Sequence, residues 1–237
     1  MAVLIDADNA QPSIIEDLLS EIAKYGTASV KRIYGDWTTP GLRGWKEVLL
    51  QFSIQPIQQF RYTVGKNATD SAMIIDAMDI LHSEEVSGFC LVSSDSDYTR
   101  LATRLRESGA FVMGIGKAAT PKAFSRACDL FVFVENLEPS SKKVRVAADQ
   151  KESSPAKPNV NDALPWLKKA FDLSVKEDGW AYLGGIGSSL RSLDPSFDHR
   201  TFGCSSLRAL VASFPKLIEL REAKGSPGNT IVSMRFK

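Results

Sequence analysis

The chain has 237 residues, of which 43% are hydrophobic and 24% are charged, and its formal net charge is +1. This is the composition of a soluble protein with a packed core, and no apolar run reaches the roughly 20 residues that span a bilayer, which excludes a transmembrane protein. The charge is uneven, because residues 1–137 contain 13 Lys and Arg against 17 Asp and Glu, a net −4, whereas residues 138–237 contain 16 against 11, a net +5. An acidic catalytic half beside a polyanion-binding half would give this pattern, and so would two domains whose solvated surfaces merely differ.

Residues 1–137 alternate short apolar runs with amphipathic stretches, which predicts strands and helices in turn. The predicted strands span 2–5, 29–34, 54–60, 88–93, 111–115 and 130–134. The predicted helices span 12–26, 44–52, 69–82, 98–108 and 122–128, and Pro12 suits a first helical turn, where its missing N–H costs nothing. Such alternation predicts an α/β fold in which a parallel sheet is sandwiched by helices on both faces.

Residues 138–159 are rich in Pro, Ser and Lys and poor in large apolar residues, which predicts a flexible linker. Beyond it, helices are predicted over 164–175, 183–193 and 205–214, followed by strands over 217–221 and 230–236. Three helices and a hairpin are the layout of a winged helix, with the turn-rich Lys224–Asn229 as its wing. We therefore expect a catalytic domain at 1–137, a linker at 138–159 and a small winged-helix domain at 160–237.

The start of the chain and its cysteines bear on where the protein resides. Met1–Asp6 has no basic region and reaches a carboxylate almost at once, so we expect no signal peptide. Cys90, Cys128 and Cys204 are widely spaced and odd in number, which predicts neither a disulfide framework nor a zinc knuckle. We expect a cytoplasmic protein with no membrane partner.

Aspartates follow several strands of the predicted sheet. Asp6 and Asp8 follow the first strand, Asp70 begins the third helix, and Asp95 and Asp97 follow the fourth strand. Ligands of a parallel α/β sheet bind beyond the carboxyl ends of its strands. A group of carboxylates at that edge repels itself unless a hard cation such as Mg²⁺ or Mn²⁺ neutralises it, and such ions activate water for phosphodiester hydrolysis.

Each of these aspartates also has a purely structural interpretation. Asp97 could cap the helix that begins at Tyr98, and Asp70 could lie in a first turn because the helix dipole favours it there. Capping is the better interpretation of any one of them, but a chance grouping of all of them at one sheet edge is much less favoured. Asp76, on the same helix as Asp70 but turned away from it, could be structural or functional, and Asp36 fits a turn.

Other polar residues near the same edge are candidate contacts for a ligand. Thr69 and Ser93 could hold a metal-bound water or a phosphate. Asn9, Arg61 and Lys66 are candidate RNA contacts, although Asn9 could merely cap a helix and surface cations are usually just solvated.

Three segments, Val3–Asn9, Gly65–Met78 and Leu91–Tyr98, together resemble the NYN domain over residues 1–137. The NYN domain is a branch of the PIN-like nuclease superfamily that includes the LabA-like proteins. The resemblance implies a PIN-like or flavodoxin-like sheet and an active site that cleaves RNA with Mg²⁺ or Mn²⁺. Carried over residue by residue, it implies metal-binding and catalytic roles for four aspartates, with Asp8 and Asn9 beside them: Asp6, Asp70, Asp95 and Asp97.

Residues 160–237 resemble an OST-HTH, or LOTUS, domain through 179–187, 194–198 and 201–203. That family forms a small winged helix associated with RNA binding. Arg191, Arg200 and Arg208 could follow an RNA backbone, or could simply keep the surface soluble. The aromatic residues of this half, Trp180 and Tyr182 among them, are expected in its core rather than as stacking platforms for bases.

Three functions are compatible with these observations. The first is a metal-dependent endoribonuclease whose second domain recruits single-stranded or structured RNA. The second is a non-catalytic RNA-binding regulatory adaptor with a vestigial acidic pocket. The third, a Rossmann or flavodoxin-like small-molecule enzyme, is disfavoured because Asp6–Asn9 replaces a glycine-rich phosphate loop after the first strand. PIN-like nucleases often pair, so a homodimer is an open expectation.

Overall fold

The computed structural model describes residues 1–60, 68–137, 158–224 and 230–237. The chain divides into two compact units, Met1–Ser140 and Ser141–Lys237, and each is described by itself. Several features predicted from the sequence lie outside the described residues: Arg61, Lys66, most of the linker and the tip of the wing.

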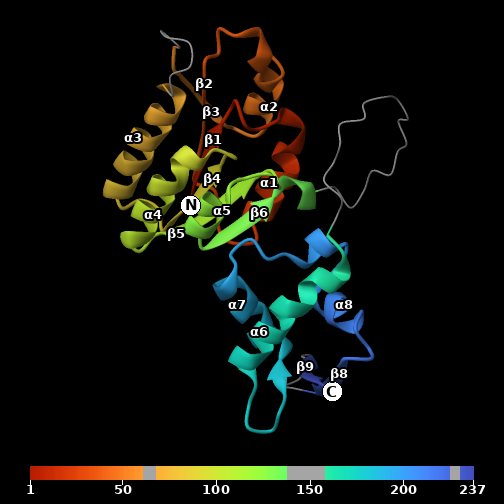
Figure 1. The fold of residues 1–237 in the computed structure, drawn as a ribbon. Helices are drawn as coiled ribbons and strands as arrows, with labels where there is room; N and C mark the ends of the chain where they lie inside the picture. The colour runs from red at the N-terminus through yellow and green to blue at the C-terminus, as the bar shows by residue number, and fades with distance from the viewer. Residues whose placement is uncertain (61–67, 138–157, 225–229) are drawn as a thin grey trace, which may run out of the picture. The chain divides into compact units, whose positions relative to one another are not determined.

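The first unit is built on a six-stranded parallel sheet with the order β3-β2-β1-β4-β5-β6 (Figure 1). Its strands are β1 (Ala2–Asp6), β2 (Val30–Gly35), β3 (Gln55–Gln58), β4 (Gly88–Val92), β5 (Phe111–Gly116) and β6 (Leu130–Phe133). Every residue of β1 and β4 is buried, which is why their sequences read as continuous apolar runs. The strand order reverses between β1 and β4, and this switch point is where parallel sheets bind their ligands.

Helices cover both faces of the sheet, as predicted (Figure 1). α1 (Ile15–Ile22) and α2 (Trp45–Gln51) pack on the face that receives Val3 and Ile5 of β1. α3 (Ala68–His82), α4 (Thr99–Glu107) and α5 (Lys122–Ala127) pack on the face that receives Ala2 and Leu4. Each large side chain buried in these two cores contributes about 1.5–3 kcal/mol relative to leaving it exposed. A crossover helix returns antiparallel to its strands, so α3 and α4 begin at the carboxyl edge of the sheet.

Some helices begin or end at residues other than the predicted ones, because of local hydrogen bonding and proline. The first predicted helix starts as a 3-10 turn at Pro12–Ile14, and its α-helical part ends at Ile22. The third helix of the second unit starts at Leu207 because the Ser206 hydroxyl accepts a hydrogen bond from the Ala209 N–H at 3.0 Å, which makes Ser206 the N-cap.

The second unit has the predicted three helices and hairpin around a separate core (Figure 1). Its helices are α6 (Leu164–Ser174), α7 (Leu183–Leu193) and α8 (Leu207–Ala212). Its antiparallel sheet, of order β7-β9-β8, contains β7 (Ala181–Tyr182), β8 (Ile218–Lys224) and β9 (Thr230–Phe236). The two-residue β7 is too short to leave a sequence pattern and exists because it pairs with β9.

The two aromatic residues around β7 have different environments. Trp180 is buried, as expected, and the guanidinium groups of Arg221 and Arg235 lie 4.4 and 4.8 Å from its ring centre. The expectation that Tyr182 is in the core is wrong, because it is 43% exposed. Its ring instead carries the Lys176 ammonium, with Nζ 3.8 Å from the ring centre, which is a cation–π contact.

No helix within the described residues is both long enough and apolar enough to cross a membrane.

Candidate metal centre

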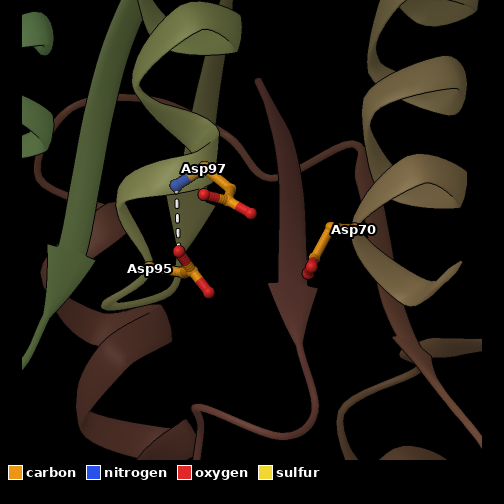
Figure 2. A group of neighbouring side chains, drawn as sticks. All are labelled: Asp70, Asp95 and Asp97. Carbon is orange, nitrogen blue, oxygen red and sulfur yellow. Dashed lines mark hydrogen bonds between the residues drawn. The ribbon is translucent and has the colours of Figure 1, made fainter. Parts of the chain in front are cut away.

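Three carboxylates meet at the carboxyl edge of the sheet, beside the switch point between β1 and β4 (Figure 2). Asp70 lies in the first turn of α3, and Asp95 and Asp97 belong to the 3-10 turn that joins β4 to α4. Each offers one oxygen within 4.8 Å of the oxygens offered by the other two. Among the described residues, no other three acidic, histidine or cysteine side chains come this close together. We call these three residues the aspartate cluster.

The spacing and chemistry of the aspartate cluster fit a small divalent cation. Mg²⁺ binds oxygen ligands at about 2.0–2.1 Å in octahedral geometry, so the ligands of one ion lie about 3 to 4 Å apart. Oxygens within 4.8 Å of one another need only a small movement to reach that arrangement. A divalent cation between them would also offset the mutual repulsion of the three carboxylates.

The turn between β4 and α4 fixes two members of the cluster. Asp95 is the N-cap of the 3-10 turn, and its Oδ1 accepts the Asp97 N–H at 2.9 Å (Figure 2). The backbone N–H of Asp95 in turn donates to the Ser93 hydroxyl at 3.1 Å. The capping role considered for Asp97 therefore belongs to Asp95, which is both a cap and a member of the cluster.

The third member, Asp70, comes from a different helix and is partly buried. Its Oδ1 accepts a hydrogen bond from the Tyr98 hydroxyl at 2.6 Å. Burial raises the pKa of Asp70, and the negative charges of Asp95 and Asp97 raise it further, against the lowering effect of the Tyr98 bond. Without a cation, this carboxylate is therefore destabilised in its charged form.

Asp6 ends β1 and is only 1% exposed, but it does not belong to the aspartate cluster. Its Oδ1 accepts the Asp8 N–H at 3.0 Å, and its Oδ2 accepts from Asn9 Nδ2 at 2.6 Å and from the Ser93 hydroxyl at 2.9 Å. Burial raises the pKa of Asp6, and the charge of Asp70 also contributes. Through Ser93, which also accepts from Asp95, the Asp6 carboxylate links the end of β1 to the turn that carries the cluster. Asn9, predicted as an RNA contact, has its amide directed to Asp6.

Gly116, at the end of β5, permits a close approach behind Ser93. A Cβ atom at this position would lie 2.5 Å from the Ser93 carbonyl oxygen and 2.7 Å from the Thr120 hydroxyl. Both distances are shorter than van der Waals contact, so only glycine fits here without movement of the neighbouring strand. Gly116 thus has a packing role at the end of β5.

The other two aspartates considered from the sequence have structural partners. The Asp76 carboxylate accepts from the Tyr34 hydroxyl and pairs with the Arg32 guanidinium, both from β2. Asp36 Oδ1 accepts from the Thr38 N–H at 3.2 Å and its hydroxyl at 2.6 Å, as expected of a turn residue.

In the second unit, two of the three predicted RNA-binding arginines already have carboxylate partners. Arg200 Nη2 lies 2.6 Å from Asp198 Oδ2, and Arg208 pairs with Glu222. Arg191 lies on the exposed surface of α7. Sequence reasoning missed Lys176, Arg221 and Arg235, which contact aromatic rings. Arg221 and Arg235 lie in the paired strands β8 and β9, and such pairing has no local signal in the sequence.

The raised pKa values of Asp6 and Asp70 predict how stability depends on pH in the metal-free protein. Their folded-state pKa values lie above the ordinary value of 3.8, so the folded state binds protons where the unfolded state does not. Stability is therefore gained as the pH falls through the folded-state pKa values and is lost as the pH rises through them. We expect the unfolding free energy of wild type, relative to an Asp70→Asn variant in EDTA, to rise as the pH falls from neutrality toward the ordinary value of 3.8.

Urea unfolding of both proteins at each pH measures this difference, and the subtraction cancels the carboxylates whose pKa does not depend on the charge of Asp70. With Mn²⁺ present the trend should reverse, because a cation needs deprotonated ligands. A wild type that loses stability relative to the variant as the pH falls in EDTA would contradict the destabilised state of Asp70.

Comparisons with known proteins identify both halves of the chain. The NYN domain family matches residues 1–138, and the OST-HTH/LOTUS domain family matches residues 164–230. One similar solved structure is a protein of unknown function from Vibrio parahaemolyticus, 18% identical, with a TM-score of 0.48, covering 57% of this chain and 93% of that one. Another is an uncharacterized protein from Nitrosomonas europaea, 28% identical, with a TM-score of 0.29, covering 42% of this chain and 91% of that one. No match was found among curated proteins.

Proposed function

The chain belongs to the NYN domain family, a branch of the PIN-like nucleases, and from this premise we propose that it is a metal-dependent endoribonuclease whose OST-HTH/LOTUS domain recruits RNA. The observation that carries the proposal is the aspartate cluster at the switch point of the sheet. If Asp95 and Asp97 served only to cap a helix, Asp70, which belongs to α3, would not need to lie beside them.

Asp70, Asp95 and Asp97 would hold Mg²⁺ or Mn²⁺, both of which prefer carboxylate oxygens. Such an ion supplies activation of water at neutral pH and stabilisation of the charge that develops on the phosphate. Neighbouring residues position these ligands: the Ser93 hydroxyl accepts the Asp95 N–H and itself donates to Asp6, and the Tyr98 hydroxyl donates to Asp70.

Within the first unit, carboxylates and no imidazole are the groups that can accept a proton at this site. His82 lies in the last turn of α3, at the opposite end of that helix from Asp70, and His199 belongs to the other unit. The sequence contains no third histidine. Cleavage should therefore need no histidine of the first unit.

The substrate class that suits this site is RNA in a single strand or loop, where the backbone can approach the carboxylate edge. The second unit would add backbone and stacking contacts, for which the exposed Tyr182 ring beside Lys176 is suited. No set of side chains in the described residues suggests recognition of particular bases, so we expect weak sequence preference.

A cleavage assay on single-stranded and structured RNAs tests this function. Wild type should cleave with Mn²⁺ or Mg²⁺ and stop when EDTA is added. Asp95→Asn should lose cleavage and still fold, because an asparagine can keep the N-cap bond to the Asp97 N–H. Circular dichroism checks folding. Retained cleavage in Asp95→Asn would overturn the site, whereas tight RNA binding without turnover on any substrate would overturn catalysis and favour the adaptor.

A further inference from the structure

We propose that Tyr98 is a positioning residue of the metal site, and that its hydroxyl fixes the carboxylate of Asp70 in the orientation that meets Asp95 and Asp97. The inference rests on the proposed metal site and deepens it, because it assigns a role to a residue that offers no ligand itself. The inference is based on the hydrogen bond between the buried phenol of Tyr98, which lies in the turn before α4, and the carboxylate of Asp70, which lies on α3.

The position of the Tyr98 hydroxyl is set by core packing. The ring is fully buried among the residues that pack α3 and α4 on the sheet, and it lies 6.4 Å from the Phe124 ring, centre to centre. A buried phenol needs a hydrogen-bond partner, and here the partner is Asp70 Oδ1 at 2.6 Å. This distance is typical of a hydroxyl that donates to a charged carboxylate. Packing of the ring restricts the position of the Tyr98 hydroxyl, and the hydrogen bond in turn restricts the position of Asp70 Oδ1.

One short segment therefore sets the geometry of all three carboxylates. Asp95 caps the 3-10 turn, Asp97 lies inside it, and Tyr98 is its last residue. The turn thus carries two members of the aspartate cluster and the hydrogen-bond donor of the third. Without the Tyr98 hydroxyl, the Asp70 side chain could rotate about its own χ angles, and the mutual repulsion of the three carboxylates would favour rotation away from the other two.

The same helix provides a matched control. Asp76, also on α3, accepts a hydrogen bond from the hydroxyl of Tyr34, which is fully buried like Tyr98. Asp76 is not a member of the aspartate cluster. Removing either hydroxyl deletes one bond between a buried tyrosine and an aspartate of α3, but only Tyr98→Phe removes it from the metal site.

The test measures Mn²⁺ binding by the full chain, using electron paramagnetic resonance to count free Mn²⁺ in wild type, Tyr98→Phe and Tyr34→Phe. We expect the Kd for Mn²⁺ to rise about 10- to 100-fold in Tyr98→Phe, the range found when a residue that orients a ligand is removed. In Tyr34→Phe it should stay near the wild-type value. Water-proton relaxation per bound Mn²⁺ should rise in Tyr98→Phe alone, because a water replaces the Asp70 oxygen.

A double-mutant cycle keeps the inference testable if Tyr98→Phe also loosens the fold. In an Asp70→Ala background, Tyr98→Phe should weaken Mn²⁺ binding no further, since the carboxylate that it positions is no longer there. Equal Mn²⁺ binding by wild type and Tyr98→Phe, equal weakening in both phenylalanine variants, or additive losses in the cycle would each overturn the role of Tyr98. A wild type that binds no Mn²⁺ would overturn the metal site and this role together, which separates the two failures.

Discussion

Asp70→Asn is expected to lower Mn²⁺-dependent RNA cleavage by about 100-fold or more while it raises the thermal stability of the metal-free protein. A catalytic cation contributes several kcal/mol to the stabilisation of a transition state, and each 1.36 kcal/mol is a factor of ten in rate. Stability rises because burial and the charges of Asp95 and Asp97 disfavour the ionised Asp70 in the folded state. An asparagine removes that charge but can keep the acceptor oxygen that Tyr98 needs.

Asp79→Asn is the matched control, because Asp79 is an exposed residue of the same helix and its change alters the net charge of the chain equally. Cleavage rates with saturating RNA and melting temperatures in EDTA should be measured for both variants and wild type. Cleavage by Asp70→Asn at the wild-type rate would exclude Asp70 from the site. A lower melting temperature than wild type in EDTA would mean that the lost charge had been stabilising, contrary to the repulsion inferred within the cluster.

The sequence alone was sufficient to predict the parallel sheet and the edge of that sheet at which the site lies. Val3 and Ile5 face one core and Leu4 the other, so β1 reads as an unbroken apolar run, and Asp6 directly follows it. Parallel topology then brings the ends of β1 and β4 together, which is a general property of such sheets and needs no side-chain detail.

The arrangement within that edge could not be predicted, because it depends on differences of a few ångströms. Asp6 and Asp70 look alike in the sequence, yet Asp6 is surrounded by donors from Asn9 and Ser93 whereas Asp70 joins the aspartate cluster. The bond between Tyr98 and Asp70 joins residues 28 positions apart and depends on how α3 and α4 pack. No local pattern reports such a bond.

Side-chain contacts in the second unit could not be predicted either, because its candidate RNA-binding arginines were chosen by residue type alone. The sequence shows that Arg200 and Arg208 are cationic, but it does not show that carboxylates of the same unit pair with them. The exposure of Tyr182 could not be predicted either, because Tyr182 lies in β7, a strand that forms only by pairing with β9. Residue type therefore shows that the second half is cationic, but it does not show which of its cations are already paired.

Leu210→Asp is expected to raise the KM for long RNA about 100-fold and to leave kcat and the Kd for Mn²⁺ unchanged. Leu210 is fully buried in the core of the second unit, which shares no residue with the two cores of the first. A charge buried there costs several kcal/mol, comparable to the whole stability of a domain of this size. The second unit should unfold and stop recruiting RNA, and losing one of two linked binding sites commonly weakens binding by 10²–10⁴.

Leu173→Asp is the control, because Leu173 is 65% exposed on α6 and the change adds the same negative charge without unfolding the unit. Comparing the two variants separates loss of the folded domain from simple repulsion of RNA by the new charge. Near-ultraviolet circular dichroism monitors the tryptophans of both units, and steady-state kinetics on long and short RNAs gives KM and kcat. An unchanged KM for long RNA in Leu210→Asp would remove the recruiting role of the second unit. A fall in kcat on short RNA would instead show that the aspartate cluster depends on the second unit, and the two halves would then have to be treated as one catalytic body.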